Sequence, residues 1–337
     1  MKVSDRRPLP RRPLSLPVFG LGCAQIGSLY QPMDDAEAAA LLASAWEVGL
    51  RFFDTAPLYG YTRSERRLAL ALAGHDRDAF VLSTKVGRLM RPDATVRRGD
   101  NGWADPLPFR PIFDYTRDGL MRSYEDSLLR LDLERIDILL VHDIGRLTHG
   151  DRHEKYWQEL TAGGGFRALE ELRQSGAVSA IGLGVNEWQI AHASMQELDL
   201  DCTVLAGRYT LLEQDSLSPF LDECVRRGHA IVVAGPLNSG ILAGGDTYNY
   251  VQAPAHVVER VRALEAACRE LDVPLPAAAL QFPLAHPAVV SCIAGADSAA
   301  QVRQNSEWFE AAIPPELWST LRKRGLIDER APAPGDR

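Results

Sequence analysis

The chain has 337 residues, of which 46% are hydrophobic and 24% charged, and its formal net charge is −8. This composition is typical of a globular protein whose core is large enough to fold without disulfides or structural metals. The acidic balance disfavours a nucleic-acid partner, because phosphates bind basic surfaces, and the five cysteines include no C-x-x-C pair that would indicate a disulfide framework or a zinc site.

The N-terminal segment is basic and rich in proline, and it lacks the apolar core of a signal peptide. No later stretch approaches the roughly 18–20 apolar residues of a membrane span. These features predict a cytoplasmic protein with no membrane partner. Residues 1–16, and residues 328–337 at the other end, are expected to be flexible tails.

Between these tails, short apolar β-branched runs alternate with amphipathic helical stretches, which is typical of parallel strands joined by helical crossovers. The runs are apolar on every side, and this favours strands covered on both faces. Eight strands are predicted, at residues 18–23, 51–56, 80–86, 136–141, 178–185, 202–207, 230–235 and 289–296.

Four helices with recognisable ends are predicted in the gaps. The helix at residues 34–49 begins with acidic residues and stops at Gly49. The helix at residues 116–132 has Thr116 as its candidate N-cap. Two further amphipathic helices are predicted at residues 166–176 and 256–272.

Eight strands with interleaved helices predict an α/β protein, a single (β/α)8 TIM barrel over residues 17–327 with its active site at the C-terminal rim of the strands. An open, doubly wound sheet is the alternative. It is disfavoured because Gly20, Gly22 and Gly27 do not form a G-x-G-x-x-G turn that opens a helix.

Three long connections follow predicted strands, and in a barrel all three would lie at the C-terminal rim: residues 88–115, 143–164 and 236–255. In the second connection, His149 and His153 have the spacing of a metal-binding pair on a helix. Gly150 and the loop-like composition argue against a helix there, so no metal site is expected.

Titratable side chains end the second, third and fourth predicted strands, namely Asp54, Lys85 and His142, and Tyr59 follows Asp54 in a tight loop. Neighbouring strands are about 4.8 Å apart, so these four side chains can converge on a small volume. Each residue alone is more often a helix cap, a solvated rim residue or a packing group. Their joint placement indicates a functional site.

The four residue types suit proton transfer. A lysine ammonium favours the tyrosine phenolate, an aspartate keeps the lysine protonated, and a histidine can hydrogen-bond a carbonyl or hydroxyl oxygen. Together they can move a proton on or off an oxygen while another group moves a hydride. None of the four carries a hydride, so a cofactor is implied.

The chain resembles the aldo-keto reductase family over nearly its whole length, in the segments FGLGCAQIG, GLRFFDTAPLYGYTRSE, VLSTKVG, ERIDILLVHD, AGPLNSGIL and IAGADSAAQVRQN. This resemblance implies a nicotinamide-dependent oxidoreductase. It implies that Tyr59 is the general acid/base and that Lys85 lowers the pKa of Tyr59. In the same way, Asp54 would orient Lys85, and His142 would orient the substrate.

The resemblance also implies a set of cofactor contacts. Two positions depart from the family, because Ala234 replaces an aromatic residue that usually stacks on the nicotinamide and Ala206 replaces a glutamine. The implied contacts are Gly22, Cys23 and Asp54 at the nicotinamide, Asn186 at its carboxamide, Leu237 and Ser239 at the pyrophosphate, Gln301 near the adenosine 2′ position, and Asn305 at the adenine.

The cofactor is expected to be NAD or NADP, with NAD favoured. Relatives selective for NADP carry a lysine and an arginine where this chain has Gly295 and Gln301. Losing those cations removes charge-assisted hydrogen bonds to a 2′-phosphate. Arg303 is close enough in sequence to compensate, which keeps NADP as the alternative.

Within the family, the segments GRLMRP, GVNEWQ and LAGRYTLLEQ look most like the branch of L-fucose and D-threo-aldose 1-dehydrogenases, which also holds pyridoxal 4-dehydrogenase. The main prediction is therefore oxidation of the anomeric hydroxyl of an aldose to a lactone, and Trp103, Trp188 and Tyr250 are candidates to line a sugar pocket. The alternatives are oxidation of the pyridoxal hemiacetal to 4-pyridoxolactone, general reduction of aldehydes or ketones, and a nucleotide-binding barrel with little catalysis.

Overall fold

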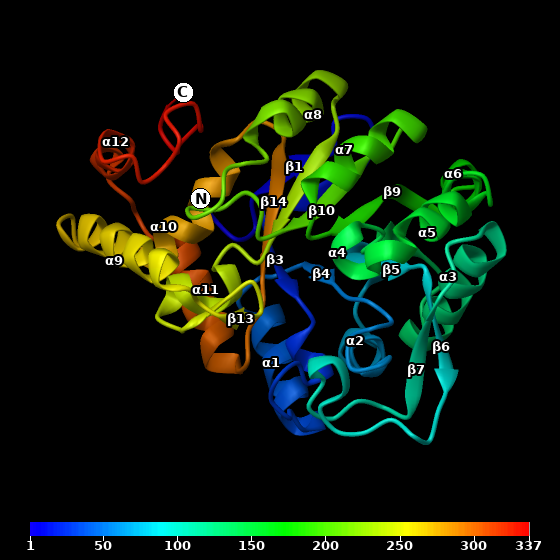
Figure 1. The fold of residues 1–337 in the computed structure, drawn as a ribbon. Helices are drawn as coiled ribbons and strands as arrows, with labels where there is room; N and C mark the ends of the chain where they lie inside the picture. Colours follow the sequence, from blue (N-terminus) through cyan, green and yellow to red (C-terminus); the bar gives the residue numbers. More distant parts are fainter. Residues whose placement is uncertain (337) are drawn as a thin grey trace.

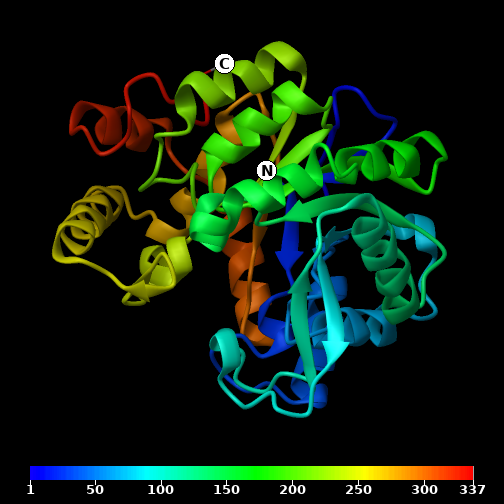
Figure 2. The same ribbon diagram turned by 45° about the vertical axis from the view of Figure 1, so that its right-hand side comes forward.

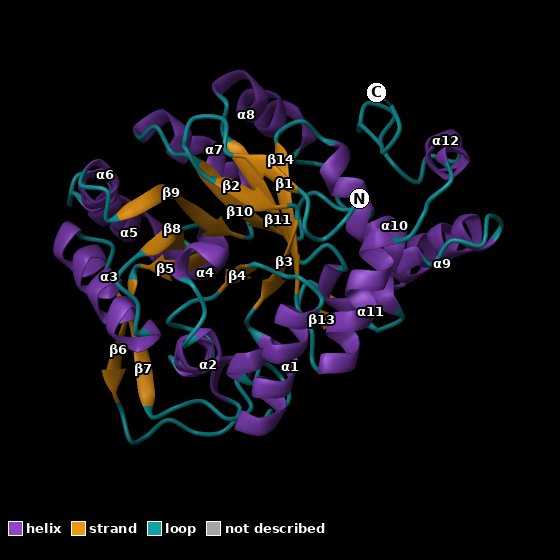
Figure 3. Ribbon diagram, turned by 180° about the vertical axis from the view of Figure 1, so that it is seen from behind, coloured by secondary structure: helices purple, strands orange, loops and turns teal. Residues whose placement is uncertain are grey.

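The computed structural model describes residues 1–336 and contains a closed barrel of eight strands, in which every neighbouring pair is parallel. The predicted barrel architecture is confirmed, and the strands occupy the centre of Figure 3. Around the barrel the strands are β3 (Phe19–Gly22), β4 (Phe52–Asp54), β5 (Val81–Val86), β8 (Ile136–His142), β9 (Val178–Val185), β10 (Cys202–Ala206), β11 (Ala230–Ala234) and β14 (Val289–Ala294).

Helices surround the barrel, and at least one lies between each barrel strand and the next along the chain (Figure 3). Apolar side chains between helices and strands form the main core, while a second cluster fills the inside of the barrel. The larger helices are α1 (Asp35–Glu47), α2 (Arg63–Leu72), α3 (Arg117–Leu131), α6 (Gly165–Gln174), α7 (Trp188–Glu197), α8 (Asp222–Arg227), α9 (Ala255–Arg269), α10 (Leu275–Gln281), α11 (Ala299–Glu310) and α12 (Pro315–Lys323).

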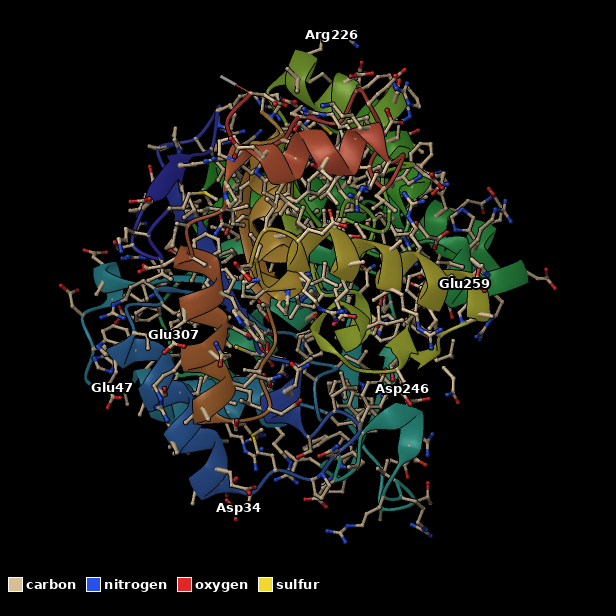
Figure 4. All side chains as sticks on the ribbon, turned by 90° about the vertical axis from the view of Figure 1, so that its left-hand side faces the viewer. Asp34, Glu47, Arg226, Asp246, Glu259 and Glu307 are labelled. Carbon is tan, nitrogen blue, oxygen red and sulfur yellow. The ribbon has the colours of Figure 1, made fainter. Side chains whose placement is uncertain are left out.

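Two helices begin where the sequence predicts, because side chains cap their first turns. Asp34 Oδ1 accepts a hydrogen bond from the Glu37 backbone N–H, and the Glu37 carboxylate accepts one from the Asp34 N–H, both at 2.8 Å. Asp34 and Glu47 mark the two ends of α1 in Figure 4. The Thr116 hydroxyl accepts from the Gly119 N–H at 3.2 Å and caps α3.

Residues 1–16 and 328–336 are packed, in contrast to the flexible tails expected, and residue 337 lies outside the described residues. Residues 1–16 contribute a hairpin of β1 (Arg6–Pro8) and β2 (Ser15–Pro17), seen in blue beside β14 in Figure 1. Leu9 and Leu16 of this segment are buried against the cluster inside the barrel. These leucines shield the apolar side chains at this end of the barrel from water. At the other end Ala331 is buried, and Arg322 Nη1 donates to Asp336 Oδ1 at 3.1 Å.

The connection at residues 88–115 leaves the rim as a long antiparallel hairpin of β6 (Arg88–Pro92) and β7 (Phe109–Phe113), drawn in cyan in Figure 2. The connection at residues 236–255 contains a 3-10 helical segment (Asn238–Ala243) and a short hairpin of β12 (Thr247–Tyr248) and β13 (Val251–Gln252).

The connection at residues 143–164 forms two short helices, α4 (Arg146–His149) and α5 (His153–Leu160), with Gly150 between them at a φ of 51°. The expectation that no single helix carries both His149 and His153 is confirmed, because α4 ends at the first histidine and α5 begins at the second, although most of the connection is helical. Both histidines pack inward. His149 Nε2 lies 2.9 Å from the Tyr115 hydroxyl, and His153 Nδ1 lies 3.1 Å from the Ile144 carbonyl oxygen.

Within residues 1–336, no helix combines the length and the apolarity needed to cross a membrane. In the same part of the chain, no cluster of three or more His, Cys, Asp or Glu side chains is arranged to hold a metal ion.

Candidate active site

A cavity of about 430 Å³ opens at the carboxyl ends of the barrel strands. Its floor contains the last residues of several strands, including Gly22, Asp54, His142, Ala206 and Ala234. A second hollow of about 550 Å³ lies between α1 and α2 and contains none of these residues. The strand-end cavity is therefore the candidate site.

The structure brings the four predicted catalytic residues together in this cavity. Lys85 Nζ donates to Asp54 Oδ2 at 2.8 Å, to the Thr55 carbonyl oxygen at 2.9 Å, and to the Tyr59 hydroxyl oxygen at 3.0 Å. The Tyr59 and His142 rings meet edge to face, with centroids 5.9 Å apart. Parallel pairing of β4, β5 and β8 places their carboxyl ends side by side, which explains this convergence.

Lys85 is buried, and its environment holds it in the charged form. Burial alone would lower the pKa of Lys85, but the Asp54 carboxylate and the Tyr59 oxygen outweigh that effect and raise the pKa above its ordinary value. The other Asp54 oxygen accepts a hydrogen bond from the Ser83 hydroxyl at 2.7 Å. Asp54 therefore presents one fixed oxygen to the ammonium.

Two opposing effects act on Tyr59. Burial raises the pKa of the Tyr59 hydroxyl above 10, and the Lys85 ammonium opposes that rise. Lys85 contributes a lowering of the Tyr59 pKa, as expected. Burial outweighs this contribution, and the net shift of the pKa is upward. The phenol is the dominant form of Tyr59 at neutral pH.

His142 is held as a neutral imidazole. Burial lowers the pKa of His142 well below 6.5, and the charges of Arg88 and Lys85 lower it further. Among the described residues, no hydrogen-bond partner reaches His142 Nδ1, while Nε2 lies 3.4 Å from Asp143 Oδ2. This arrangement favours a proton on Nε2, so His142 can donate a hydrogen bond into the cavity.

Three candidate pocket aromatics have different positions. Trp103 lines the cavity with its ring centroid 5.8 Å from that of Tyr59, and Tyr250 lines the rim. Trp188 instead stacks on Phe220 at a centroid distance of 6.3 Å and is absent from the cavity wall within the described part of the chain. Two of the three aromatic side chains can therefore contact a ligand.

Five of the implied cofactor residues line the cavity: Gly22, Cys23, Asp54, Asn186 and Ser239. Leu237 does not, because its side chain packs against the hydrophobic core, and the next residue, Asn238, takes its place at the wall. Asn238 was missed because the position at which a loop turns inward depends on its backbone, which has a φ of 47° here.

Asn186 lines the cavity, whereas the next residue, Glu187, does not. Its Oδ1 accepts a hydrogen bond from the Tyr250 hydroxyl at 3.2 Å, and its Nδ2 donates to Asp143 Oδ1 at 3.4 Å. Glu187 points elsewhere and accepts from the Leu147 N–H at 2.8 Å. Asp143, which directly follows His142, also lines the cavity and was not predicted.

The two residues expected to contact the adenosine, Gln301 and Asn305, lie on α11 beside the cavity. Asn305 Nδ2 donates to the carbonyl oxygen of Gly295, a cavity residue, at 3.1 Å. Gln301 Oε1 accepts from the Asp297 N–H at 2.5 Å. Arg303 Nη1 donates to the Ser44 hydroxyl at 2.9 Å, so its guanidinium is directed toward α1. This contact argues against the compensating role that the sequence left open for Arg303.

The cavity fits a nicotinamide dinucleotide. Two buried amide oxygens, Asn238 Oδ1 and Asn305 Oδ1, have no hydrogen-bond partner within residues 1–336. Unpaired acceptors at these two positions suit ligand groups that donate hydrogen bonds, such as the amino groups of a carboxamide and of an adenine. Ala206 and Ala234 leave room on the floor where larger side chains would fill it.

Comparison with known proteins identifies the family. A model of the aldo/keto reductase family matches residues 18–324. The chain belongs to the aldo-keto reductase family. It is therefore an NAD(P)-dependent oxidoreductase, as the sequence predicts. An aldo-keto reductase of Bacillus halodurans, AKR11C1 in its holo form, has a similar structure, with a TM-score of 0.72, 26% identity, and coverage of 95% of this chain and 96% of that one.

Two relatives bear on the branch of the family. The pyridoxal 4-dehydrogenase of Microbacterium luteolum is 50% identical over 340 residues, covering 97% of this chain and 99% of the relative. The D-threo-aldose 1-dehydrogenase of a Pseudomonas species is 40% identical, covering 93% and 95%. The higher identity favours the pyridoxal alternative over the aldose reaction that the sequence motifs placed first.

Proposed function

We propose that this aldo-keto reductase oxidises the cyclic hemiacetal of pyridoxal to 4-pyridoxolactone, with NAD as the cofactor. The observation that carries the chemistry is the Tyr59 hydroxyl on the cavity wall, 3.0 Å from the Lys85 ammonium. The 50% identity to a pyridoxal 4-dehydrogenase over almost the full length of both chains supports this substrate.

In this proposal Tyr59 is the general base. Its oxygen takes the proton from the hemiacetal hydroxyl, and the Lys85 ammonium stabilises the phenolate that must form first. Asp54 keeps Lys85 charged and oriented through its 2.8 Å contact. His142 donates a hydrogen bond from Nε2 to a substrate oxygen, which directs the hemiacetal carbon.

The bound nicotinamide ring supplies the acceptor for the hydride on the hemiacetal carbon. The substrate thus loses one proton to Tyr59 and one hydride, and its C–OH becomes the lactone carbonyl. Gly22 and Asn186 would hold the nicotinamide end, and Asn305 would accept a hydrogen bond from the adenine.

Aldose oxidation is the second candidate, because an aldopyranose is also a cyclic hemiacetal and the D-threo-aldose 1-dehydrogenase is 40% identical. The first candidate has a planar aromatic ring, which suits a wall made by Trp103 and Tyr59. An aldose would instead require several hydrogen-bond partners for its hydroxyl groups.

The test is a substrate panel with purified protein and NAD. It contains pyridoxal, L-fucose, D-arabinose, L-galactose and two matched controls, 5′-deoxypyridoxal and pyridoxal 5′-phosphate, which cannot close the hemiacetal ring. We expect lactone formation from pyridoxal and a kcat/KM at least about 100-fold lower for both controls, because neither presents the hemiacetal hydroxyl whose proton Tyr59 removes. Faster turnover of an aldose than of pyridoxal would contradict the proposed substrate.

Pyridoxal 5′-phosphate also tests whether the cations near the cavity are available to bind a phosphate group. Lys85 is paired with Asp54, Arg88 with Asp143, and Arg208 donates to the Asn186 carbonyl oxygen at 2.8 Å. These cations are therefore already engaged, which disfavours binding of a phosphorylated substrate.

The residues at the start of α11 support the proposed preference for NAD. The resemblance places the 2′ position of the adenosine near Gly295 and Gln301, neither of which is charged, and Arg303 is directed toward Ser44.

We expect Gln301→Arg to raise the ratio of kcat/KM for NADP to that for NAD about tenfold, since one charge-assisted hydrogen bond is gained. Initial rates with both cofactors measure it, and Gln304→Arg on the exposed side of the same helix is the control. An unchanged ratio in Gln301→Arg would contradict this placement of the adenosine.

A further inference from the structure

His142 and Asp143 lie on one wall of the cavity, and Arg88 contacts Asp143 from behind that wall. Arg88 Nη2 donates to Asp143 Oδ2 at 2.7 Å. His142 Nε2 lies 3.4 Å from the same oxygen. Two nitrogen donors therefore compete for one carboxylate oxygen, and the arginine has the shorter contact.

Both members of the ion pair are held in place. Arg88 is buried, and its guanidinium carbon lies 5.2 Å from the centroid of the Phe113 ring, its partner across the β6–β7 hairpin. The other Asp143 oxygen contacts Asn186 Nδ2 at 3.4 Å. These two contacts hold the Asp143 carboxylate in its observed orientation.

Charged and titratable groups face His142 from several elements. Asp54 is engaged with Lys85, so Asp143 is the carboxylate positioned to stabilise an imidazolium at His142. The surrounding groups are Tyr59 after β4, Lys85 on β5, Arg88 on β6, Asp143 after β8, and Tyr115, whose hydroxyl donates to the His142 carbonyl oxygen at 2.8 Å and contacts His149.

We propose that Arg88 is a positioning residue that, by binding Asp143, keeps His142 neutral and leaves its Nε2–H free for the substrate oxygen. Without Arg88, the Asp143 carboxylate would draw a proton onto the imidazole and form a buried ion pair with it. The Nε2–H would then be committed to Asp143 instead of the substrate. The role of the substrate oxygen rests on the proposed function, whereas the protonation of His142 does not.

The electrostatics agree with this geometry. Burial lowers the pKa of His142, and Arg88 is the charged group that lowers it most. Removing the guanidinium while keeping Asp143 should therefore raise the pKa of His142.

The test begins with NMR on protein labelled with ¹⁵N-histidine, without substrate or cofactor. The chain has eight histidines, and the signal of His142 is assigned by its loss in His142→Gln. In Arg88→Gln we expect the His142 titration midpoint to rise by about one pH unit or more, as removal of a nearby like charge predicts. Arg63→Gln, which breaks the Arg63–Asp105 pair outside the cavity, is the control and should leave His142 unchanged.

Two further variants separate the charge from simple disruption of the fold. Arg88→Lys keeps the positive charge and should restore the wild-type titration. Arg88→Gln with Asp143→Asn removes the attracting carboxylate and should cancel the rise. The proposal is overturned if His142 titrates alike in wild type and Arg88→Gln, or if the double variant titrates like Arg88→Gln.

If Arg88→Gln does not fold, Arg88→Met is the second variant, because it also removes the positive charge while keeping a long side chain. The His142 titration midpoint should rise in Arg88→Met as well, and an unchanged midpoint would overturn the proposal.

The kinetic readout is the pH profile of kcat/KM. We expect Arg88→Gln to gain an additional acid limb at the NMR midpoint, below which its kcat/KM relative to the wild type falls about tenfold per pH unit. If the substrate panel shows no turnover, the proposed function fails while the NMR result still stands. An NMR midpoint that rises with no acid limb would overturn the claim that His142 must be neutral to act.

Discussion

Replacing Tyr59 by phenylalanine is expected to lower kcat about 1,000-fold, while the Kd for NAD changes less than about threefold. The substitution removes the group that accepts the substrate proton, a contribution of about 10²–10⁴-fold for a general base, and leaves the rest of the cavity wall in place. Steady-state kinetics and a fluorescence titration with the cofactor measure the two effects. The matched control is Tyr124→Phe on α3, which removes a hydroxyl hydrogen-bonded to the Ala177 carbonyl oxygen and should retain activity.

The same substitution should change the pH profile of oxidation. Burial raises the pKa of Tyr59 above 10, with Lys85 opposing, so the phenolate fraction in the free protein grows throughout the range from pH 7 to 10. The wild-type kcat/KM should therefore rise by up to about tenfold per pH unit, and the residual rate of Tyr59→Phe should lack this rise. A similar slope in both proteins would assign the titration to another group.

Replacing Lys85 by methionine is expected to reduce both activity and stability. Without the ammonium, the phenolate of Tyr59 loses its nearest positive charge, and we expect kcat to fall about 100-fold or more. Asp54 is left buried without its ionic partner, since Lys85 and Asp54 are both nearly inaccessible to solvent. Breaking one side of a buried pair in this way destabilises proteins by about 3–5 kcal/mol. Urea unfolding and steady-state kinetics provide the two measurements.

A double variant separates the two roles of Lys85. Adding Asp54→Asn to Lys85→Met removes the uncompensated charge, so part of the lost unfolding free energy should return while kcat stays low. Lys155→Met removes an exposed lysine of α5 and should change neither quantity. If Lys85→Met is as stable as the wild type, the pair contributes nothing net to folding.

The barrel could be predicted because its signals are local. Apolar runs such as residues 136–141 and 178–185 became β8 and β9 with nearly the same bounds. Helix starts followed from short-range capping, as at Thr116. The packed N-terminal hairpin could not be predicted, because Leu9 and Leu16 are buried only once the barrel end they cover exists.

The cluster of candidate catalytic residues was equally accessible to prediction, whereas the residues that support it were not. Asp54, Lys85 and His142 each end a strand, and parallel pairing brings strand ends together in any barrel. Arg88 has no such signal, because it reaches Asp143 only after the chain turns at Gly87, which has a φ of 100°. A side chain there would bring its Cβ into steric conflict with the Tyr115 ring, so this turn requires glycine.

By itself, the sequence determined the barrel, its strand order and the four residues that meet at its rim, since hydrophobic periodicity and strand-end position are properties of short segments. The tertiary structure decided which rim residues face the cavity, such as Asn238 instead of Leu237, and which charge neutralises Asp143. Those outcomes depend on loops whose conformations are set by contacts between residues far apart in the chain, and no local pattern encodes such contacts.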